Sequence, residues 1–168
     1  AVRYGNVLGS SGSALPKFIQ MAKDGKKISI TDPNMTRFSL TMDEALDFIL
    51  QSTFLGKGSE VFVPKLHAYS IMDLKNAVSK LIQDTGETRI PVRPGEKLHE
   101  ILINNDEMKY TWQLKDKFVI FSPLKAESEI KKEYPGIKKP KLANSYSSNS
   151  VDKISVDELK SIITTLNF

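Results

Sequence analysis

Three loops of the sequence carry residue types that can hold a phosphate group. The first loop, Gly5–Ser13, consists mainly of glycine and serine and directly precedes a segment whose apolar residues have helical spacing. Backbone N–H groups of such a loop, together with the positive end of the helix that follows, can bind an anion. A loop of this composition is also an ordinary turn, and both interpretations stay open at this point.

Each of the other two loops contains one arginine. Arg37 follows a turn at Asp32-Pro33-Asn34, and Arg93 directly precedes Pro94-Gly95-Glu96. A guanidinium group can hold a phosphate through two parallel hydrogen bonds, which a lysine cannot do. The Glu96 carboxylate could accept hydrogen bonds from two ribose hydroxyls. Each residue alone is also explained as a solvated surface charge, but together they fit a nucleoside diphosphate site.

The sequence shows no pairing of a nucleophile with a base, so no catalytic residue is assigned. Tyr134 and Lys138 have the spacing of a Tyr-x-x-x-Lys pair, but Pro135 and Gly136 lie between them and would break the required helix. His67 and His99 are too far apart in sequence to form a local metal-binding motif. Because cysteine is absent, disulfides and cysteine-ligated metals are excluded, and no metal site is predicted.

The spacing of apolar residues predicts alternating helices and strands. Helices are expected over residues 14–24, 41–53, 70–83 and from Ser155, and strands over residues 1–4, 28–30, 60–63 and 89–92. A hairpin is expected over residues 109–121. Capping boxes predict three of the helix starts, at Thr41, Ser70 and Ser155. This alternation is typical of the α/β class.

The length of 168 residues suits one domain with an appendage. Residues 1–121 are expected to form the body, and residues 122–168 a C-terminal arm and helix, because residues 122–150 are rich in Lys, Pro, Ser and Asn. No apolar run approaches the roughly 18 residues that a membrane span needs, and no signal peptide is visible. The start at Ala1-Val2-Arg3-Tyr4 resembles the middle of a strand, which suggests a piece of a longer protein.

The composition is that of a globular protein, with 40% hydrophobic and 26% charged residues. The net charge of +4 fits an anionic ligand, although a solvated lysine surface explains it equally well. A nucleic-acid binder is disfavoured, because the sequence has no basic stripe interleaved with aromatic residues.

Four blocks of sequence occur in the order found in a known family, and the match covers nearly the whole chain. They are Arg3–Ser10, Ser13–Pro16, Thr31–Phe38 and Arg93–Glu100. The chain resembles the C-terminal half of the extended short-chain dehydrogenase/reductases, and more narrowly the inverting UDP-N-acetylglucosamine 4,6-dehydratases of polysaccharide biosynthesis. The tail Tyr146-Ser147-Ser148-Asn149 is similar to that of capsule-type members. The resemblance implies the last Rossmann strands, 1–4 and 60–63, with a small mixed α/β substrate-binding domain.

The resemblance also implies roles for individual residues. For the substrate, these are Asn6 at the diphosphate or sugar, Leu15 and Ile30 around the uracil, Arg37 and Arg93 at the diphosphate, and Glu96 at the ribose. For the cofactor, Tyr4 and Gly5 would lie near the nicotinamide end of NADP. From the residues alone, Leu15 and Ile30 are equally explained as packing in the core.

In a complete enzyme, the resemblance implies an internal redox reaction followed by elimination of water. NADP accepts a hydride from C4 of the sugar, water leaves from C6, and the hydride returns to C6. The glycine-rich cofactor motif and the Tyr-x-x-x-Lys pair would lie in a preceding Rossmann segment, because neither occurs here as a helix-compatible motif. The resemblance further implies a cytoplasmic protein that is a homo-oligomer when complete, with no nucleic-acid partner.

Two alternatives to the dehydratase stay open. A UDP-sugar 4-epimerase would share the diphosphate clamp, although Met35-Thr36-Arg37-Phe38 favours the dehydratase because epimerases usually have Asp after the arginine. A non-catalytic module that binds nucleotide sugars is favoured by the missing cofactor motif if this chain is the whole gene product. The exact sugar is not determined by the sequence.

Overall fold

The computed structural model describes residues 1–142 and 144–166. The chain divides into two compact units, each built from separate stretches of sequence. Unit 1 contains Ala1–Tyr4, Asp43–Leu66 and Ile101–Ser147, and unit 2 contains Gly5–Met42, His67–Glu100 and the chain from Ser148 onward. The elements are of both types, so the α/β class predicted from the sequence is confirmed. None of the boundaries between the two units falls at residue 121, where the body was expected to end.

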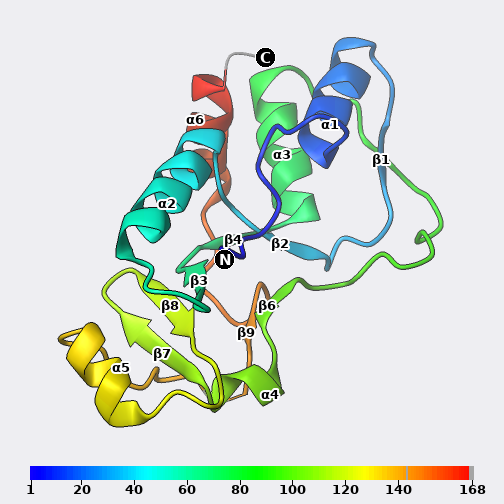
Figure 1. Cartoon of the computed structure of the whole chain (residues 1–168). Helices are drawn as coiled ribbons and strands as arrows, with labels where there is room; N and C mark the ends of the chain where they lie inside the picture. Colours follow the sequence, from blue (N-terminus) through cyan, green and yellow to red (C-terminus); the bar gives the residue numbers. More distant parts are fainter. Residues whose placement is uncertain (143, 167–168) are drawn as a thin grey trace. The chain divides into compact units, whose positions relative to one another are not determined.

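Three helices form the apolar core of unit 2. They are α1 (Ala14–Lys23), α3 (Ile71–Leu81) and α6 (Val156–Thr165), and α3 contacts both of the others (Figure 1). Each helix buries the face that its apolar periodicity defines. Two of the predicted capping boxes are present, with Ser70 bonded to Asp73 and Ser155 bonded to Glu158. The buried core residues include Leu15, Phe18, Leu74, Val78, Leu159 and Ile163.

Two short strand pairs complete unit 2. β1 (Ile28–Ile30) runs parallel to β5 (Glu87–Arg89), which begins two residues earlier than the strand expected at 89–92. β2 (Thr36–Phe38) runs antiparallel to β4 (Ala68–Ser70), and α3 begins directly after β4. Arg37 and Tyr69 stand opposite each other in this second pair. Two residues that are 32 positions apart in the sequence are therefore neighbours.

Unit 1 contains a three-stranded sheet in the order β3 (Val61–Pro64), β8 (Lys117–Ile120) and β7 (Thr111–Leu114). The predicted hairpin is confirmed as β7–β8, with Lys115 in the left-handed region at φ 47°. Val2 forms a single parallel bridge to Phe62, so the strand expected at residues 1–4 is present only as this one bridge to β3. Helix α2 (Met42–Leu55) precedes β3 in the sequence and contributes Phe48 to an aromatic core with Trp112.

The segment expected to be an arm belongs largely to the core of unit 1. Helix α5 (Glu127–Glu133) buries Ile130, and Tyr134 and Ile137 join the same cluster. The apolar residues are spaced by four and three positions, but lysines and glutamates surround them and hide this pattern in the composition. Further along, β9 (Tyr146–Ser147) pairs with β6 (Ile101–Ile103), and a short helix, α4 (Asn105–Met108), follows β6.

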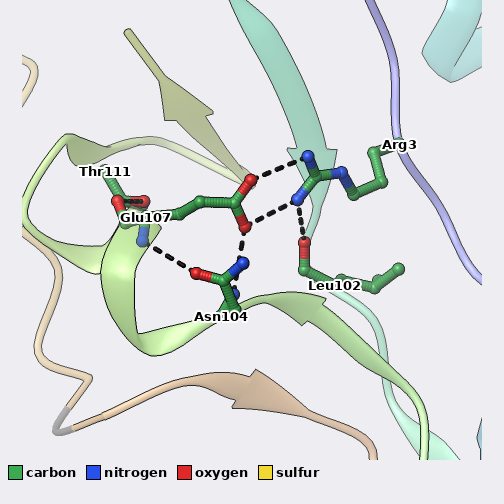
Figure 2. A network of polar contacts seen from close by, with 5 residues as sticks. All are labelled: Arg3, Leu102, Asn104, Glu107 and Thr111. Carbon is green, nitrogen blue, oxygen red and sulfur yellow. Dashed lines mark hydrogen bonds and ion pairs between the residues drawn. The ribbon is translucent and has the colours of Figure 1, made fainter. Parts of the chain in front are cut away.

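An ion pair ties the beginning of the chain to α4 (Figure 2). Arg3 donates two hydrogen bonds of 2.8 Å to the Glu107 carboxylate, and its Nη1 also donates to the Leu102 carbonyl at 2.8 Å. Glu107 completes a capping box with Asn104 at the start of α4. The bidentate geometry makes this pair stronger than an ordinary surface salt bridge, and the hydrogen bonds from Arg3 lower the pKa of Glu107.

We expect the ion pair of Glu107 to be lost as the solution becomes acidic. Because the folded-state pKa of Glu107 is lowered, its contribution to stability is present above the unfolded pKa of about 4.3 and is lost as the pH falls through the folded pKa. Glu107→Gln should therefore lose less stability than the parent between pH 6 and pH 3 in urea unfolding. The control Asp106→Asn changes an exposed carboxylate in the same turn and should follow the parent curve. A parent-like curve for Glu107→Gln would contradict the role of the pair.

Helix α2 exposes an apolar stripe of Leu46, Leu50 and Phe54, spaced by four residues. Phe54 is 85% exposed and borders an apolar depression of about 820 Å³ next to Leu55 and Pro135. Apolar patches of this kind mediate association in solution. We therefore expect the 168-residue chain, produced alone, to bind a hydrophobic dye or to associate, and Phe54→Lys to reduce both effects. The control Thr53→Lys adds the same charge to α2 outside the stripe and should leave them unchanged. A monomeric, dye-silent parent would contradict this expectation.

Among residues 1–142 and 144–166, no helix is long and apolar enough to cross a membrane. The same residues contain no cluster of three or more His, Cys, Asp or Glu side chains that could hold a metal ion.

Candidate functional site

A small cavity of about 80 Å³ lies within unit 2, between the loop at residues 6–14 and the strand pair β2–β4. Its lining includes three of the six residues that the resemblance assigns to the substrate, namely Asn6, Leu15 and Arg37. Ser13 and Tyr69 also line it. The cavity lining therefore combines apolar residues with one cation, one amide and two hydroxyls. These polar groups can recognise a phosphate or a sugar.

Backbone geometry holds the loop at residues 5–13 in place beside the cavity. Gly9 and Gly12 have φ values of 83° and 79°, which favour glycine. The Leu8 N–H donates to the Leu40 carbonyl at 2.7 Å, which ties the loop to the chain after β2. Ser13 precedes α1, but its side chain makes no capping hydrogen bond. Its Oγ is buried without a hydrogen-bond partner in the part of the chain that the structure describes, so it is available to a ligand.

Arg37 is oriented by backbone carbonyls. Its Nη1 donates to the Thr36 carbonyl at 2.7 Å and to the Leu98 carbonyl at 3.2 Å. Its Nη2 lies 3.6 Å from the Met35 sulfur. Carbonyl oxygens hold the guanidinium without neutralising its charge, so Arg37 is pre-oriented and can still attract an anion.

Tyr69 is a site residue that the sequence reasoning missed. It lies opposite Arg37 in the β2–β4 pair, and its side chain is buried. Burial, followed by the negative charge of Glu100, raises the pKa of the Tyr69 hydroxyl well above its usual value. The hydroxyl therefore stays protonated and can donate a hydrogen bond to an oxygen of a ligand. Only the pairing of two strands that are distant in sequence reveals this residue.

Glu100 is a carboxylate near the strand pair, on the Phe38 side. Burial raises its pKa, while the Phe38 N–H donates to its Oε2 at 3.0 Å and the charge of Arg37 acts in the opposite direction. Phe38 and Glu100 also explain why position 5 is a glycine. A Cβ on Gly5 would lie 2.8 Å from the Phe38 Cβ and 3.2 Å from Glu100 Oε2. The requirement for glycine at position 5 therefore follows from packing.

Leu15 and Ile30 both belong to the apolar core of unit 2. Leu15 also lines the cavity, whereas Ile30 is 1% exposed and is not among the lining residues. The packing role that the sequence pattern allowed is thus present for both residues. A contact between Ile30 and a uracil stays a prediction.

Arg93 and Glu96 face each other across a tight turn. The Glu96 N–H donates to the Arg93 carbonyl at 3.0 Å, and the Arg93 N–H donates to Glu96 Oε2 at 3.2 Å. Thr31 Oγ1 lies 3.4 Å from Glu96 Oε1, which ties the turn to the end of β1. The Arg93 side chain is exposed and does not line the cavity, so the second arm of the diphosphate clamp stays a prediction.

Tyr4 and Gly5 were expected at the nicotinamide end of NADP. Tyr4 lies in unit 1, where it packs against the aromatic core, and Gly5 lies in unit 2. Tyr134, the first residue of the Tyr-x-x-x-Lys string, is a core residue at the end of α5. Unit 2 thus contains a small cavity lined by Arg37, and the roles of Tyr4 and Gly5 at a cofactor stay predictions.

Comparison with known proteins identifies the family. The family described as "Polysaccharide biosynthesis protein" matches residues 1–122, and the chain belongs to this family. The family-level resemblance seen in the sequence is thereby confirmed.

Individual relatives are of two kinds. A UDP-glucose 4-epimerase of Rickettsia rickettsii is 34% identical over 99% of this chain and 49% of its own length. A UDP-N-acetylglucosamine 4,6-dehydratase (inverting) of Campylobacter jejuni is 37% identical over 73% of this chain and 36% of its own length. The X-ray structure of Pen from Bacillus thuringiensis is similar with a TM-score of 0.85 and 34% identity, over 98% of this chain and 49% of that chain. The chain spans about half the length of these relatives, or less.

Proposed function

We propose that this chain is the substrate-binding half of an enzyme that modifies a UDP-sugar in polysaccharide biosynthesis, and that the enzyme is a UDP-N-acetylglucosamine 4,6-dehydratase. The observation that carries the proposal is Arg37, a guanidinium oriented by two backbone carbonyls in a cavity with Asn6 and Tyr69. The family and the dehydratase relative support it.

In this proposal, Arg37 binds the diphosphate from the cavity side, and Arg93 approaches it from the turn at residues 93–96. Glu96 accepts hydrogen bonds from the ribose hydroxyls, and Asn6 bonds to the diphosphate or the sugar. Leu15 supplies apolar contact for the uracil, with Ile30 behind it in the core. These residues bind and orient the substrate, and none of them takes part in proton or hydride transfer.

Among the residues that the structure describes, the surroundings of Gly5 do not by themselves form a nicotinamide site. The space beside Gly5 is filled by Phe38 and Glu100, so the missing Cβ leaves no cradle for a nicotinamide ring. The proposed NADP would supply the hydride acceptor, and the other half of the enzyme would bind it and hold the acid and base groups.

A UDP-sugar 4-epimerase is the second candidate, favoured by the Rickettsia relatives that match 99% of this chain. The two activities differ in their products, because only a dehydratase eliminates water. Incubating the full-length gene product with UDP-N-acetylglucosamine and following the sugar by NMR separates them. Appearance of a 4-keto-6-deoxy sugar supports the dehydratase, and a C4 epimer supports the epimerase.

Binding of the nucleotide part tests the proposal independently of the reaction. We expect calorimetry to detect UDP binding to the full-length gene product, with UMP, which lacks the second phosphate, binding more weakly. UDP binding without either product would favour the non-catalytic module. Absence of UDP binding would overturn the proposed function.

A further inference from the structure

Ser148 lies at the centre of a buried hydrogen-bond network in unit 2. The residue is fully buried, and its Oγ lies 2.7 Å from Thr36 Oγ1 and 3.1 Å from the Thr36 carbonyl oxygen. The Glu100 N–H donates to the same Oγ at 2.9 Å, and the Ser148 N–H donates to the Glu100 carbonyl at 2.9 Å. The first residue after β9 is therefore bonded to both the strand that carries Arg37 and the end of the Arg93–Glu100 block.

One assignment of protons satisfies all these contacts at once. A serine hydroxyl has one proton to donate and two lone pairs that accept. Ser148 then donates to the Thr36 carbonyl and accepts from both the Glu100 N–H and the Thr36 hydroxyl. Because the Thr36 hydroxyl has given its proton, it must accept from His99, whose Nδ1 lies 2.8 Å away. In this assignment the His99 ring donates from Nδ1.

The carbonyl that Ser148 holds is the same one that orients Arg37. The Thr36 carbonyl accepts from Ser148 Oγ and from Arg37 Nη1 at 2.7 Å. The second carbonyl bonded to Nη1 belongs to Leu98, and it also accepts from the Thr36 N–H at 3.0 Å. The direction of the guanidinium therefore depends on a peptide group that Ser148 holds from its buried side.

We infer that Ser148 is a positioning residue for Arg37, so that the C-terminal segment takes part in building the anion site. Ser148 does not line the cavity and acts on a ligand only through the Thr36 carbonyl and the Arg37 guanidinium. The inference rests on the proposed function where it concerns UDP. Its claim about the orientation of Arg37 stands on the contacts alone.

A double-mutant cycle on the full-length gene product tests this coupling, with UDP as the probe in calorimetry. We expect Ser148→Ala to weaken UDP binding roughly three- to tenfold, the equivalent of one neutral hydrogen bond. In an Arg37→Ala background, the same substitution should cause little further loss, because the group that Ser148 positions is gone. Equal losses in both backgrounds, or no loss in the parent, would overturn the inference.

Ser155→Ala is the matched control, because Ser155 caps α6 in the same unit and its hydroxyl is bonded to Glu158. It should lower the melting temperature, as a lost N-cap does, while leaving UDP binding unchanged. If it weakens UDP binding as much as Ser148→Ala does, the effect reflects stability and the inference fails.

A second readout separates this inference from the proposed function. NMR relaxation of the Arg37 Nε–H group should show increased motion in Ser148→Ala and parent-like motion in Ser155→Ala, with no ligand present. If the parent fails to bind UDP, the proposed function falls, and this measurement still decides the role of Ser148. Unchanged Arg37 motion in Ser148→Ala would overturn the inference.

Discussion

Replacing Arg37 by alanine should weaken UDP binding to the full-length gene product by about ten- to a hundredfold, because a charge-assisted hydrogen bond contributes roughly 1.5–3 kcal/mol. The guanidinium is already oriented by two carbonyls, so little side-chain entropy is lost when an anion binds. Arg37→Lys should restore only part of the affinity, because the ammonium keeps the charge and loses the planar fork. Titration calorimetry measures these differences directly.

Three further variants show whether the loss is specific to the proposed clamp. Arg93→Ala should weaken UDP binding to a similar degree if the turn at residues 93–96 supplies the second arm. Glu96→Gln should have a smaller effect, since an amide oxygen still accepts from a hydroxyl. The control Arg89→Ala removes an arginine on β5 that is bonded to Glu87, and it should bind UDP like the parent. If Arg37→Ala and Arg93→Ala also bind like the parent, the clamp is wrong.

Replacing Ile130 by alanine should cost about 2–5 kcal/mol of unfolding free energy, the usual cost of truncating a buried isoleucine. Ile130 is 3% exposed and packs in the aromatic core of unit 1. If residues 122–150 were an arm without a core, the same change would cost almost nothing. Urea unfolding followed by tryptophan fluorescence is a suitable measurement, because Trp112 belongs to the same cluster.

Leu124→Ala is the control for this measurement. Leu124 lies in the same segment but is 95% exposed, so its truncation should change the unfolding free energy by less than about 0.5 kcal/mol. Limited proteolysis gives a second comparison, since a protected 127–137 region indicates core and early cleavage there indicates an arm. Equal and small losses for Ile130→Ala and Leu124→Ala would contradict the structure.

Several elements were predictable because their signals are local. The capping boxes at Ser70 and Ser155 place the starts of α3 and α6, since the donor and acceptor are only three residues apart. The β7–β8 hairpin follows from alternating residues around a two-residue turn. Arg37 was selected from the sequence by residue type and loop position, and Asn6 and Leu15 by the family resemblance alone. The structure places all three at one cavity.

Other features depend on residues that are distant in sequence. Tyr69 reaches the cavity only because β4 pairs with β2, and Ser148 meets the Thr36 carbonyl across 112 positions. Periodicity alone assigns no partner to such residues. The burial of Ile130 was concealed for a related reason, because its segment is polar in composition and becomes core only against Trp112 and Phe121.

By itself, the sequence determined the starts of α1, α2, α3 and α6, the hairpin, the α/β class, the family resemblance and the identity of the cation proposed to bind the substrate. These depend on interactions within a few residues or on the types of the residues themselves. Only the tertiary structure decided which carbonyls orient Arg37, which hydroxyls stand beside it, and which polar segment packs into the core. Those contacts join residues that are brought together by strand pairing and helix packing, and no short stretch of sequence records them.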